Sequence, residues 1–422
     1  MTGGALVVGL GSRAELWVRG LAARGRLAAF CDTTGQRMRV HNEWLTEAGY
    51  PPVPEYPAGD FPDVLRRVRP ETVVVCTPDS THAGYVVAAL GAGCDVVVEK
   101  PLATTAEDLR RIFLAERASA GRVRVGFNYR YNPVHAKVKE LLASGVIGEI
   151  GSVHFEWCLD THHGADYFRR WHRDKRRSGG LLVHKSAHHF DLVSWWLDAE
   201  PVRVFAEGRL FHYRPGTGDG RFALELTDSP RLERLYGGAP GGYRRDLSPF
   251  DPGVSIEDDV AVVARFRTGA SLTYHLTAYS PWEGYRVSFN GAGGRLELVV
   301  QESEWARPGS AQAAARLSGS PDIPPPVSTV TVRPQWNRPY RVELPPVDGA
   351  HGGGDVRLLA DVLDEPAADP LGRAAGLRDG IRSAVIGLCA NESIATGGVV
   401  DAAAALRRIT GEPVAAPEGR RG

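Results

Sequence analysis

The chain has 422 residues, and its 50 basic and 50 acidic side chains give a formal net charge of zero. A balanced charge lacks the basic surface expected of a protein that binds nucleic acid or an anionic membrane. No apolar run is long enough to cross a bilayer, and the first residues lack the basic start and cleavage site of a secretory signal. The five cysteines are widely spaced without a C-x-x-C pair, which favours a cytoplasmic protein with reduced thiols.

The first third of the sequence alternates short apolar strands with helical patterns. Such alternation predicts right-handed crossovers and a doubly wound parallel sheet of the Rossmann kind over residues 1–127. The predicted strands are Ala5–Gly9, Leu27–Cys31, Thr72–Cys76, Val96–Val98 and Val123–Phe127.

A glycine-rich turn follows the first predicted strand and opens a helix. In this setting Gly9 makes the turn, Gly11 lets the backbone approach a pyrophosphate, and the small Ala14 lets helix and strand pack closely. Ser12 and Arg13 complete the turn, where the N–H groups at the start of the helix face the ligand. The turn therefore predicts a dinucleotide site.

An acidic residue at the end of the second predicted strand favours one dinucleotide over the other. Asp32 lies about 20 residues after the turn, where a carboxylate accepts hydrogen bonds from both ribose hydroxyls. Its charge would repel a 2′-phosphate, so NAD is the predicted cofactor. Arg37 lies close enough in sequence to leave NADP as the alternative.

Two further polar segments follow strands, at the edge where doubly wound sheets bind ligands. The first contains Thr77, Pro78 and His82, and the second begins with Glu99 and Lys100. We expect these five residues to contact the cofactor. A charged pair directly after a buried strand must be held by partners or by function, and an ion pair between Glu99 and Lys100 that caps the sheet is the alternative.

Together these motifs resemble the Gfo/Idh/MocA family (glucose-fructose oxidoreductase, inositol dehydrogenase and rhizopine catabolism). The resemblance continues through the segments Gly126–Pro133, Val138–Gly145, Gly148–Val153 and Gly179–Asp191. It implies a C-terminal α/β domain with a largely antiparallel open sheet, here residues 128–412, after the dinucleotide-binding domain. It also implies interconversion of alcohol and ketone on a sugar, cyclitol or related polyol, and assembly into a homodimer or homotetramer.

The same resemblance assigns catalytic roles. Lys100 matches the family's functional lysine, whose ammonium polarises the reacting oxygen, and His188 matches the histidine of the C-terminal motif. His184 stands where the family pattern has an aspartate. On one helix the spacing of four would place His184 and His188 on one face. We expect His188 to act as the base and His184 to bind substrate or relay protons; core hydrogen bonding is the alternative for both.

The lysine content gives independent weight to Lys100. Only five of the 50 basic residues are lysines. An arginine at this position would stay charged and could not share protons, so a lysine here has a chemical reason.

The segment Asp160–His172 carries hydroxyl, imidazole, guanidinium and aromatic groups of the kind that bind sugar hydroxyls and stack on a sugar face. We expect it to roof the active cleft, with an ordinary polar loop as the alternative. For His189 a position facing the core or the cofactor stays open. The expected substrate contacts are Asn128, Arg130, His162, His163, Tyr167, Trp171 and His189.

A metal site is a weaker alternative. His184 and His188 could ligate zinc from one helix face, with His162 or His163 completing the site. Neither an H-E-x-x-H motif nor a set of cysteines accompanies them, so we predict no metal.

The rest of the chain is predicted to be mostly framework. Antiparallel hairpins are expected over 259–279 and 285–300, and a free face of their sheet is the physical basis for expecting an oligomer. Segments 214–255 and 303–350 are rich in glycine or proline and are predicted to be irregular insertions. The tail, residues 413–422, is predicted to be disordered.

These observations predict a cytoplasmic oxidoreductase that passes hydride between NAD and a sugar, cyclitol or glycoside. One alternative is a redox-neutral glycosidase, lyase or epimerase that works through a transient keto sugar with tightly bound NAD. A second alternative is a non-catalytic NAD-binding regulator.

Overall fold

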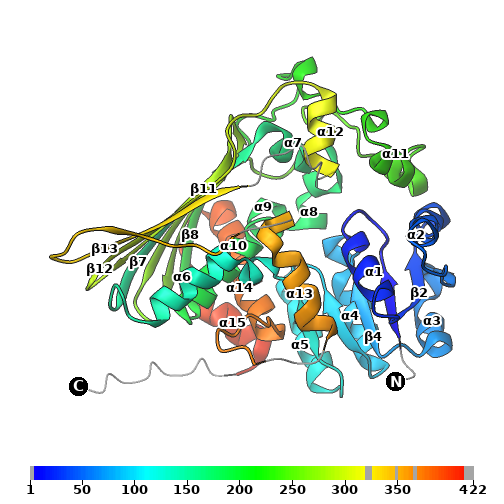
Figure 1. The fold of residues 1–422 in the computed structure, drawn as a ribbon, viewed down its shortest axis with the longest axis horizontal. Coiled ribbons are helices and arrows are strands. Elements are labelled where there is room, and N and C mark those ends of the chain that lie inside the picture. Colours follow the sequence, from blue (N-terminus) through cyan, green and yellow to red (C-terminus); the bar gives the residue numbers. More distant parts are fainter. Residues whose placement is uncertain (1–3, 319–325, 347–349, 365–367, 413–422) are drawn as a thin grey trace.

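Two β-sheets, side by side, organise the chain (Figure 1). The computed structural model describes residues 4–318, 326–346, 350–364 and 368–412, and the predicted tail at 413–422 lies outside them. Within the described ranges, every helix is too short or too polar to cross a membrane.

The first sheet has six strands in the order β3-β2-β1-β4-β5-β6, and every neighbouring pair is parallel. This is the predicted doubly wound arrangement. Its strands are β1 (Ala5–Val8), β2 (Leu27–Asp32), β3 (Glu55–Pro57), β4 (Thr72–Val75), β5 (Asp95–Val98) and β6 (Val123–Val125). The helices between them are α1 (Ala14–Ala22), α2 (Gly35–Glu47), α3 (Phe61–Val68), α4 (His82–Gly91) and α5 (Ala106–Arg117).

Helices cover both faces of this sheet. Apolar side chains of α3, α4 and α5 pack on one face, and those of α1 and α2 pack on the other. A helix from far along the chain, α13 (Gly354–Leu363), joins the second group. It lies so close to α1 that a Cβ at Gly20 would be 2.9 Å from Leu359. Residues near 354–363 therefore stabilise the nucleotide-binding domain.

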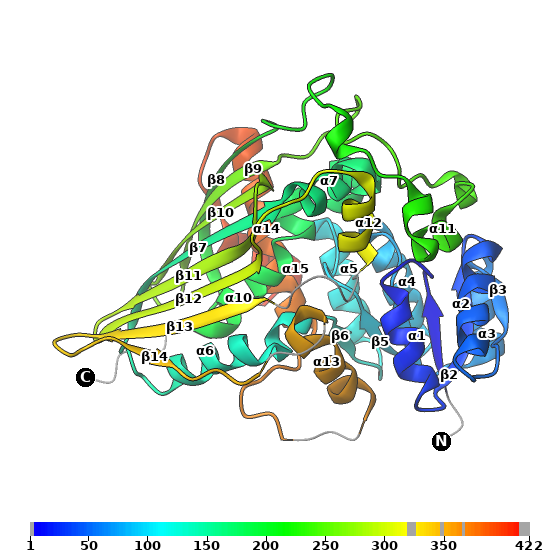
Figure 2. The ribbon, with the colours of Figure 1, turned by 45° about the horizontal axis from the view of Figure 1, so that its top comes forward.

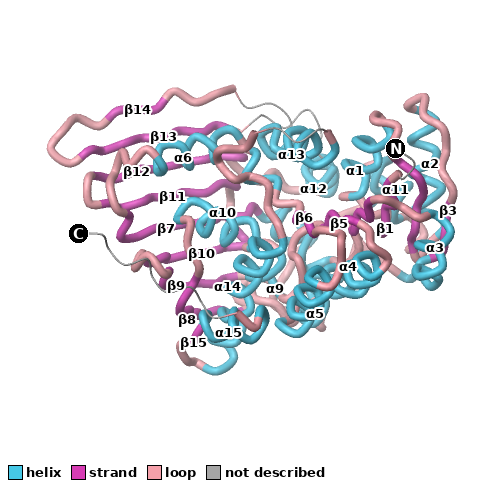
Figure 3. The backbone as a smooth tube through the Cα atoms, turned by 90° about the horizontal axis from the view of Figure 1, so that it is seen from below, coloured by secondary structure: helices cyan, strands magenta, loops and turns pink. Residues whose placement is uncertain are grey.

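The second sheet has nine strands in the order β14-β13-β12-β11-β7-β10-β9-β8-β15, as Figure 3 shows. Only β7 and β10 pair in parallel among these strands. The expected largely antiparallel open sheet and both expected hairpins are confirmed. The strands are β7 (Ile150–Asp160), β8 (Pro201–Arg209), β9 (Asp259–Phe266), β10 (Ser271–Ser280), β11 (Glu283–Gly291), β12 (Gly294–Ser303), β13 (Val327–Pro334), β14 (Tyr340–Val342) and β15 (Val400–Asp401).

Two of these strands correct the prediction that 303–350 is irregular. β13 and β14 extend the sheet, and Val330 and Val332 of β13 are fully buried on its inner face. The alternation is short and the surrounding prolines obscured it. Helix α12 (Ser310–Ser318) also lies in this segment.

Helices cover one face of the second sheet (Figures 1 and 2). They are α6 (Pro133–Ala143), α9 (Gly180–His184), α10 (Ala187–Leu197), α14 (Leu377–Thr396) and α15 (Ala402–Thr410). Alternate residues on the other face are exposed, and Val263 and Val299 are 49% and 37% exposed there. The homo-oligomer expected on this face stays a prediction.

Three local departures from the predicted elements bear on the site. The single helix expected to end at Leu197 is split into α9 and α10, because the amides of Lys185 and Ser186 both donate to Leu181 O and close a turn there. The expected polar segment after β7 is helical, as α7 (Thr161–Arg169), with Asp160 as its N-cap. Segment 214–255 is not wholly irregular, since it contains α11 (Pro230–Tyr236).

Candidate active site

A cavity of about 560 Å³ is lined from both domains. Of the twenty residues predicted for the site, the structure brings sixteen together here and places four elsewhere. The sixteen are Gly9, Gly11, Ser12, Arg13, Asp32, Thr77, Pro78, His82, Glu99, Lys100, Asn128, His163, Tyr167, Trp171, His184 and His188.

The glycine-rich turn fits the close approach that a dinucleotide requires. Gly9 has φ +86°, and a Cβ there would lie 2.7 Å from the backbone nitrogen of Thr77. Any side chain at Gly9 would therefore be strained and would push apart the ends of β1 and β4. Ala14 is fully buried at the start of α1, where its small size allows the helix to pack on the strand.

Asp32 is held in one orientation at the end of β2. One oxygen accepts from the amide of Leu10 at 2.6 Å, and the other accepts from the amide of Thr34 at 2.8 Å. Arg37 approaches the same carboxylate at 3.4 Å. A fixed carboxylate beside the glycine turn matches the ribose contact expected for NAD.

Glu99 pairs with Arg13, so the alternative of a Glu99–Lys100 ion pair is not what the structure shows. The Nε atom of Arg13 and the indole nitrogen of Trp17 both donate to Glu99 Oε1, at 2.7 and 2.9 Å. Arg13 also pairs with Asp355, which in turn accepts from Asn128 Nδ2 at 2.7 Å. Because Glu99 is paired with Arg13, Lys100 makes its contacts with other residues.

Lys100, His184 and Asp79 form a chain of contacts that joins the two domains. The ammonium of Lys100 donates to the carbonyl oxygen of His184 at 3.2 Å and lies 3.4 Å from Nε2 of the same histidine. On the other side of the ring, His184 Nδ1 lies 2.5 Å from Asp79 Oδ2. The ammonium needs an acceptor at Nε2, so the ring proton lies on the Nδ1 side, toward Asp79.

Burial shifts the proton affinities of this chain. It lowers the pKa of Lys100 to about 8, with the charge of Asp79 opposing that shift and the charge of Lys185 adding to it. Burial also lowers the pKa of His184 well below its ordinary value, and the adjacent Lys100 adds to that shift. His184 is therefore a neutral acceptor, and Lys100 is cationic near neutral pH yet able to give up a proton.

His188 lies on the cavity wall, stacked on a tyrosine. Its ring is 4.3 Å from that of Tyr129 with an interplanar angle of 13°, and it is 6% exposed. His184 ends α9 whereas His188 lies in the first turn of α10, so their side chains are set by two helices rather than by one helix face.

The substrate side of the cavity is polar and aromatic. His163 bridges Glu283 and Tyr167, with contacts of 2.7 and 3.1 Å. Trp171 stacks on His172 at 3.6 Å, and His172 meets His184 edge to face at 4.2 Å. These groups line the cavity with hydroxyl, imidazole and flat apolar surfaces.

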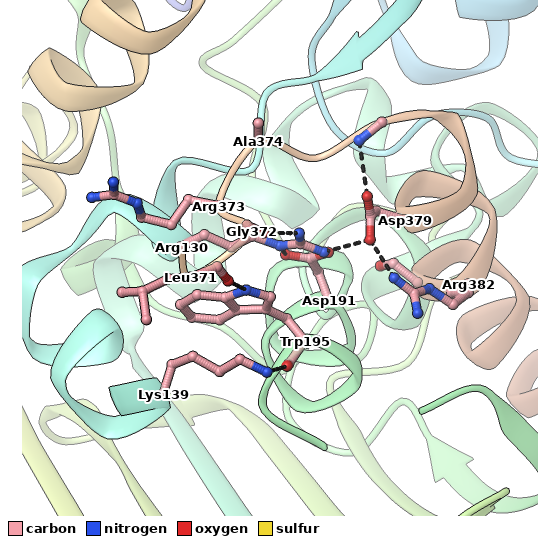
Figure 4. A network of polar contacts seen from close by, with 12 residues as sticks. Arg130, Lys139, Asp191, Trp195, Leu371, Gly372, Arg373, Ala374, Asp379 and Arg382 are labelled. Atoms are coloured by element: carbon pink, nitrogen blue, oxygen red, sulfur yellow. Dashed lines mark hydrogen bonds and ion pairs between the residues drawn. The ribbon is translucent and has the colours of Figure 1, made fainter. Parts of the chain in front are cut away.

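The four predicted residues that do not line the cavity are Ala14, Arg130, His162 and His189. Arg130 is 2% exposed and is paired with Asp191 at 2.6 Å and Asp379 at 2.9 Å (Figure 4). His162 contacts the carbonyl oxygen of Arg307, and His189 stacks on Trp157 and contacts the Tyr274 hydroxyl.

No group of three or more metal-ligating side chains gathers anywhere in the described part of the chain. His162 and His163 turn to Arg307, Glu283 and Tyr167, and His184 turns to Asp79 and Lys100. The zinc alternative therefore finds no support in this geometry.

Some cavity residues were not found from the sequence. Asp79 lies between the predicted residues Pro78 and His82 but is not itself predicted, and its partner His184 is 105 positions away. Tyr236, Tyr243 and Arg245 come from segment 214–255, which crosses to the glycine-rich turn. Two tyrosines among glycines, followed by two arginines, were the available signal in that segment.

Comparisons with known proteins place both domains in one family. Residues 4–127 match a family model described as oxidoreductase family, NAD-binding Rossmann fold (GFO_IDH_MocA), and residues 139–401 match the C-terminal alpha/beta domain of the same family. A putative oxidoreductase, YteT, of Bacillus subtilis is 35% identical over 415 residues, which cover 90% of this chain and 93% of that protein.

Two further similarities are more distant. An inositol 2-dehydrogenase of Rubrobacter xylanophilus is 34% identical over 192 residues, which cover 43% of this chain and 50% of that protein. Among solved structures, an oxidoreductase domain protein from Kribbella flavida superposes with a TM-score of 0.66 at 19% identity, covering 95% of this chain and 99% of the other. At that identity the likeness shows the fold.

Proposed function

We propose an activity for this chain from the premise that it belongs to the Gfo/Idh/MocA family of oxidoreductases, whose N-terminal domain binds NAD. The proposed reaction is the interconversion of an alcohol and a ketone on a sugar, cyclitol or glycoside. The distant similarity to an inositol 2-dehydrogenase and the polar, aromatic wall of the cavity support a polyol as substrate.

The observation that carries this proposal is a half-buried lysine, held by His184 in the same cavity as the glycine-rich turn and His188. Its environment lowers the pKa of Lys100 to about 8. Bound NAD supplies the hydride acceptor. Two N–H groups of Lys100 are directed to His184, which holds the ammonium in place and leaves its third N–H for the reacting oxygen. A charged donor at that oxygen stabilises the alkoxide that develops during oxidation.

His188 is the proposed base. Its imidazole takes the proton of the hydroxyl while the carbon-bound hydrogen leaves as hydride, so that one proton and one hydride are removed and a ketone remains. Stacking on Tyr129 fixes the ring plane at the cavity wall. His184 positions Lys100, and Asp79 holds the His184 ring in place from its other side.

A redox-neutral reaction is the second candidate, because residues of segment 214–255 cover the glycine-rich turn. A cofactor covered in this way suits an enzyme that oxidises and then reduces the same substrate molecule while both the substrate and the cofactor stay bound. A non-catalytic regulator is disfavoured, since Lys100 and His188 both reach the cavity.

One screen separates these outcomes. Sugars, cyclitols and glycosides are incubated with enzyme and NAD, with product mass and NADH absorbance recorded together. NADH release with a ketone product supports the dehydrogenase, and a cleaved or epimerised product without net NADH supports the redox-neutral enzyme. If nothing on the panel changes while NAD still binds, the proposed activity is wrong.

A further inference from the structure

Residues 229–245, which we call the clasp, run from the substrate domain across the glycine-rich turn. Their helix α11 lies beside α2 of the nucleotide-binding domain (Figures 1 and 2). Leu232 and Leu235 are fully buried against Val40 of α2. The clasp therefore has an apolar anchor on the domain that binds NAD.

Polar contacts add to this anchor. Each joins the clasp to α1, α2 or the turn that precedes α1. The contacts are Arg231 with Glu15 at 2.7 Å, Arg231 with Ser12 O at 3.2 Å, Arg234 with Glu43 and Glu47 at 2.8 and 2.9 Å, and Gln36 Nε2 with the carbonyl oxygens of Arg234 and Gly237 at 3.2 Å.

The tip of the clasp makes its closest contacts with the glycine-rich turn itself. The amide of Ser12 donates to the Tyr236 hydroxyl at 2.9 Å, and the Ser12 hydroxyl lies 2.8 Å from the same oxygen. Arg245, 4% exposed, donates to Ser12 Oγ at 3.1 Å and lies over the Tyr236 ring at 5.1 Å. An amide at the start of a helix is one of the groups that bind a phosphate oxygen.

The surroundings of the Tyr236 oxygen are those of an anion site. Burial opposes ionisation of this phenol, yet the charge of Arg245 and the two contacts from Ser12 leave the pKa of Tyr236 below its ordinary value. A position that favours negative charge on a phenol oxygen also favours a phosphate oxygen.

The clasp also reaches the ribose end of the nucleotide site. Gly241 approaches Thr34 so closely that a Cβ there would be 2.7 Å from the Thr34 methyl carbon. The guanidinium of Arg37 lies over the rings of both Tyr236 and Tyr243, at 5.9 and 5.5 Å, while facing Asp32. The two regions that hold a dinucleotide are therefore both covered by one segment.

We propose that the clasp is part of the NAD site, with Tyr236 and Arg245 holding the diphosphate against the glycine-rich turn and slowing dissociation of the cofactor. When the diphosphate binds, it replaces the Tyr236 oxygen as the acceptor of the Ser12 amide. The Tyr236 hydroxyl and Arg245 then donate hydrogen bonds to the diphosphate. The inference rests on NAD binding, and not on the roles proposed for Lys100 and His188. A retained cofactor is also what the redox-neutral candidate requires.

The dissociation rate of NADH, displaced by excess NAD in a stopped-flow fluorimeter, tests the clasp without any substrate. Arg245→Gln and Tyr236→Phe are each expected to raise this rate about tenfold or more, as loss of a hydrogen bond to a charged group implies. Arg244→Gln is the matched control, because Arg244 is exposed and paired with Asp246. It should release NADH at the rate of the unaltered protein.

Hydrogen exchange gives a second readout. NADH is expected to slow exchange of the amides of 231–243 in the unaltered protein, and to do so less in Arg245→Gln. Dissociation rates that stay within about twofold in both variants, or exchange that NADH leaves unchanged, would overturn the clasp while leaving the alcohol–ketone chemistry intact. A protein that binds no NADH would overturn both.

Discussion

The nucleotide end of the cavity is formed mainly by backbone groups, whereas the substrate end is formed mainly by ionisable side chains. At the nucleotide end, backbone conformation and backbone amides determine the site: Gly9 has a positive φ, and the Asp32 carboxylate is fixed by the amides of Leu10 and Thr34. At the substrate end, the site consists of buried and half-buried ionisable side chains that contact one another, with Lys100 and His184 at the centre.

The two ends of the cavity suit two different tasks, binding of the cofactor and transfer of a proton and a hydride. A dinucleotide needs a fixed shape and a few donors, which a strand end and a helix start supply at little cost in desolvation. A proton and hydride transfer needs groups whose proton affinities lie near the working pH, which burial beside other charges supplies. Substitutions at the two ends should therefore affect different measured quantities.

The largest expected effect is at the substrate end. Lys100→Met removes the cation proposed to stabilise the alkoxide, and kcat should fall by roughly 10² to 10⁴-fold. NADH affinity, measured by fluorescence titration, should change much less. An equal loss of kcat and NADH affinity would mean that Lys100 acts mainly in holding the cofactor.

The next effect is at the nucleotide end. Gly9→Val places a branched side chain at φ +86° and against the backbone of Thr77, so it should lower the free energy of unfolding by roughly 1–3 kcal/mol. NADH affinity should fall with it. Gly25→Val is the matched control for backbone strain, because Gly25 also has a positive φ but nothing within 4 Å of its Cβ position.

A smaller effect is expected at the ribose carboxylate. Asp32→Asn keeps the shape but removes the charge, and NAD affinity should fall about tenfold, as loss of a charged hydrogen bond implies. NADP should be tolerated better, because Arg37 loses its anionic neighbour. Titration with both nucleotides measures the ratio, and an unchanged ratio would contradict the assigned role.

The smallest effect is a shift of a pH profile. Because Lys100 must be protonated to stabilise an alkoxide, kcat for oxidation should fall as pH rises through its pKa of about 8. Asp79→Asn removes a charge that raises this pKa, so the fall should move to lower pH. Lys185→Met removes a charge that lowers it, so the fall should move to higher pH. Shifts of the same sign would contradict the assignment to Lys100.

The features that could be predicted from the sequence are the local ones. The turn at Gly9, the carboxylate at Asp32 and the segment after β5 each depend on a strand and the residues next to it, so order along the chain was sufficient. The hairpins of the second sheet followed from alternation and a short turn.

Features that depend on distant contacts were not predictable in this way. Arg130 lies two positions after Asn128, which lines the cavity, yet it turns to Asp191 and Asp379, 61 and 249 positions away. His184 and His188 have helical spacing, but the turn at Lys185 divides them between α9 and α10. The position of Tyr236 on Ser12 depends on how α11 packs on α2, which nothing local specifies.

The central claim is that hydride transfer occurs in the cavity that contains Lys100, whether or not NADH is released. Stopped-flow absorbance of the nicotinamide on mixing NAD-loaded enzyme with a substrate found by the screen tests it most directly. A rise in NADH absorbance is predicted for the unaltered protein, lasting for a dehydrogenase and transient for a redox-neutral enzyme, and a rise at least roughly 10²-fold slower for Lys100→Met. Substrate conversion without any nicotinamide signal, or equal rates in the two proteins, would contradict the claim.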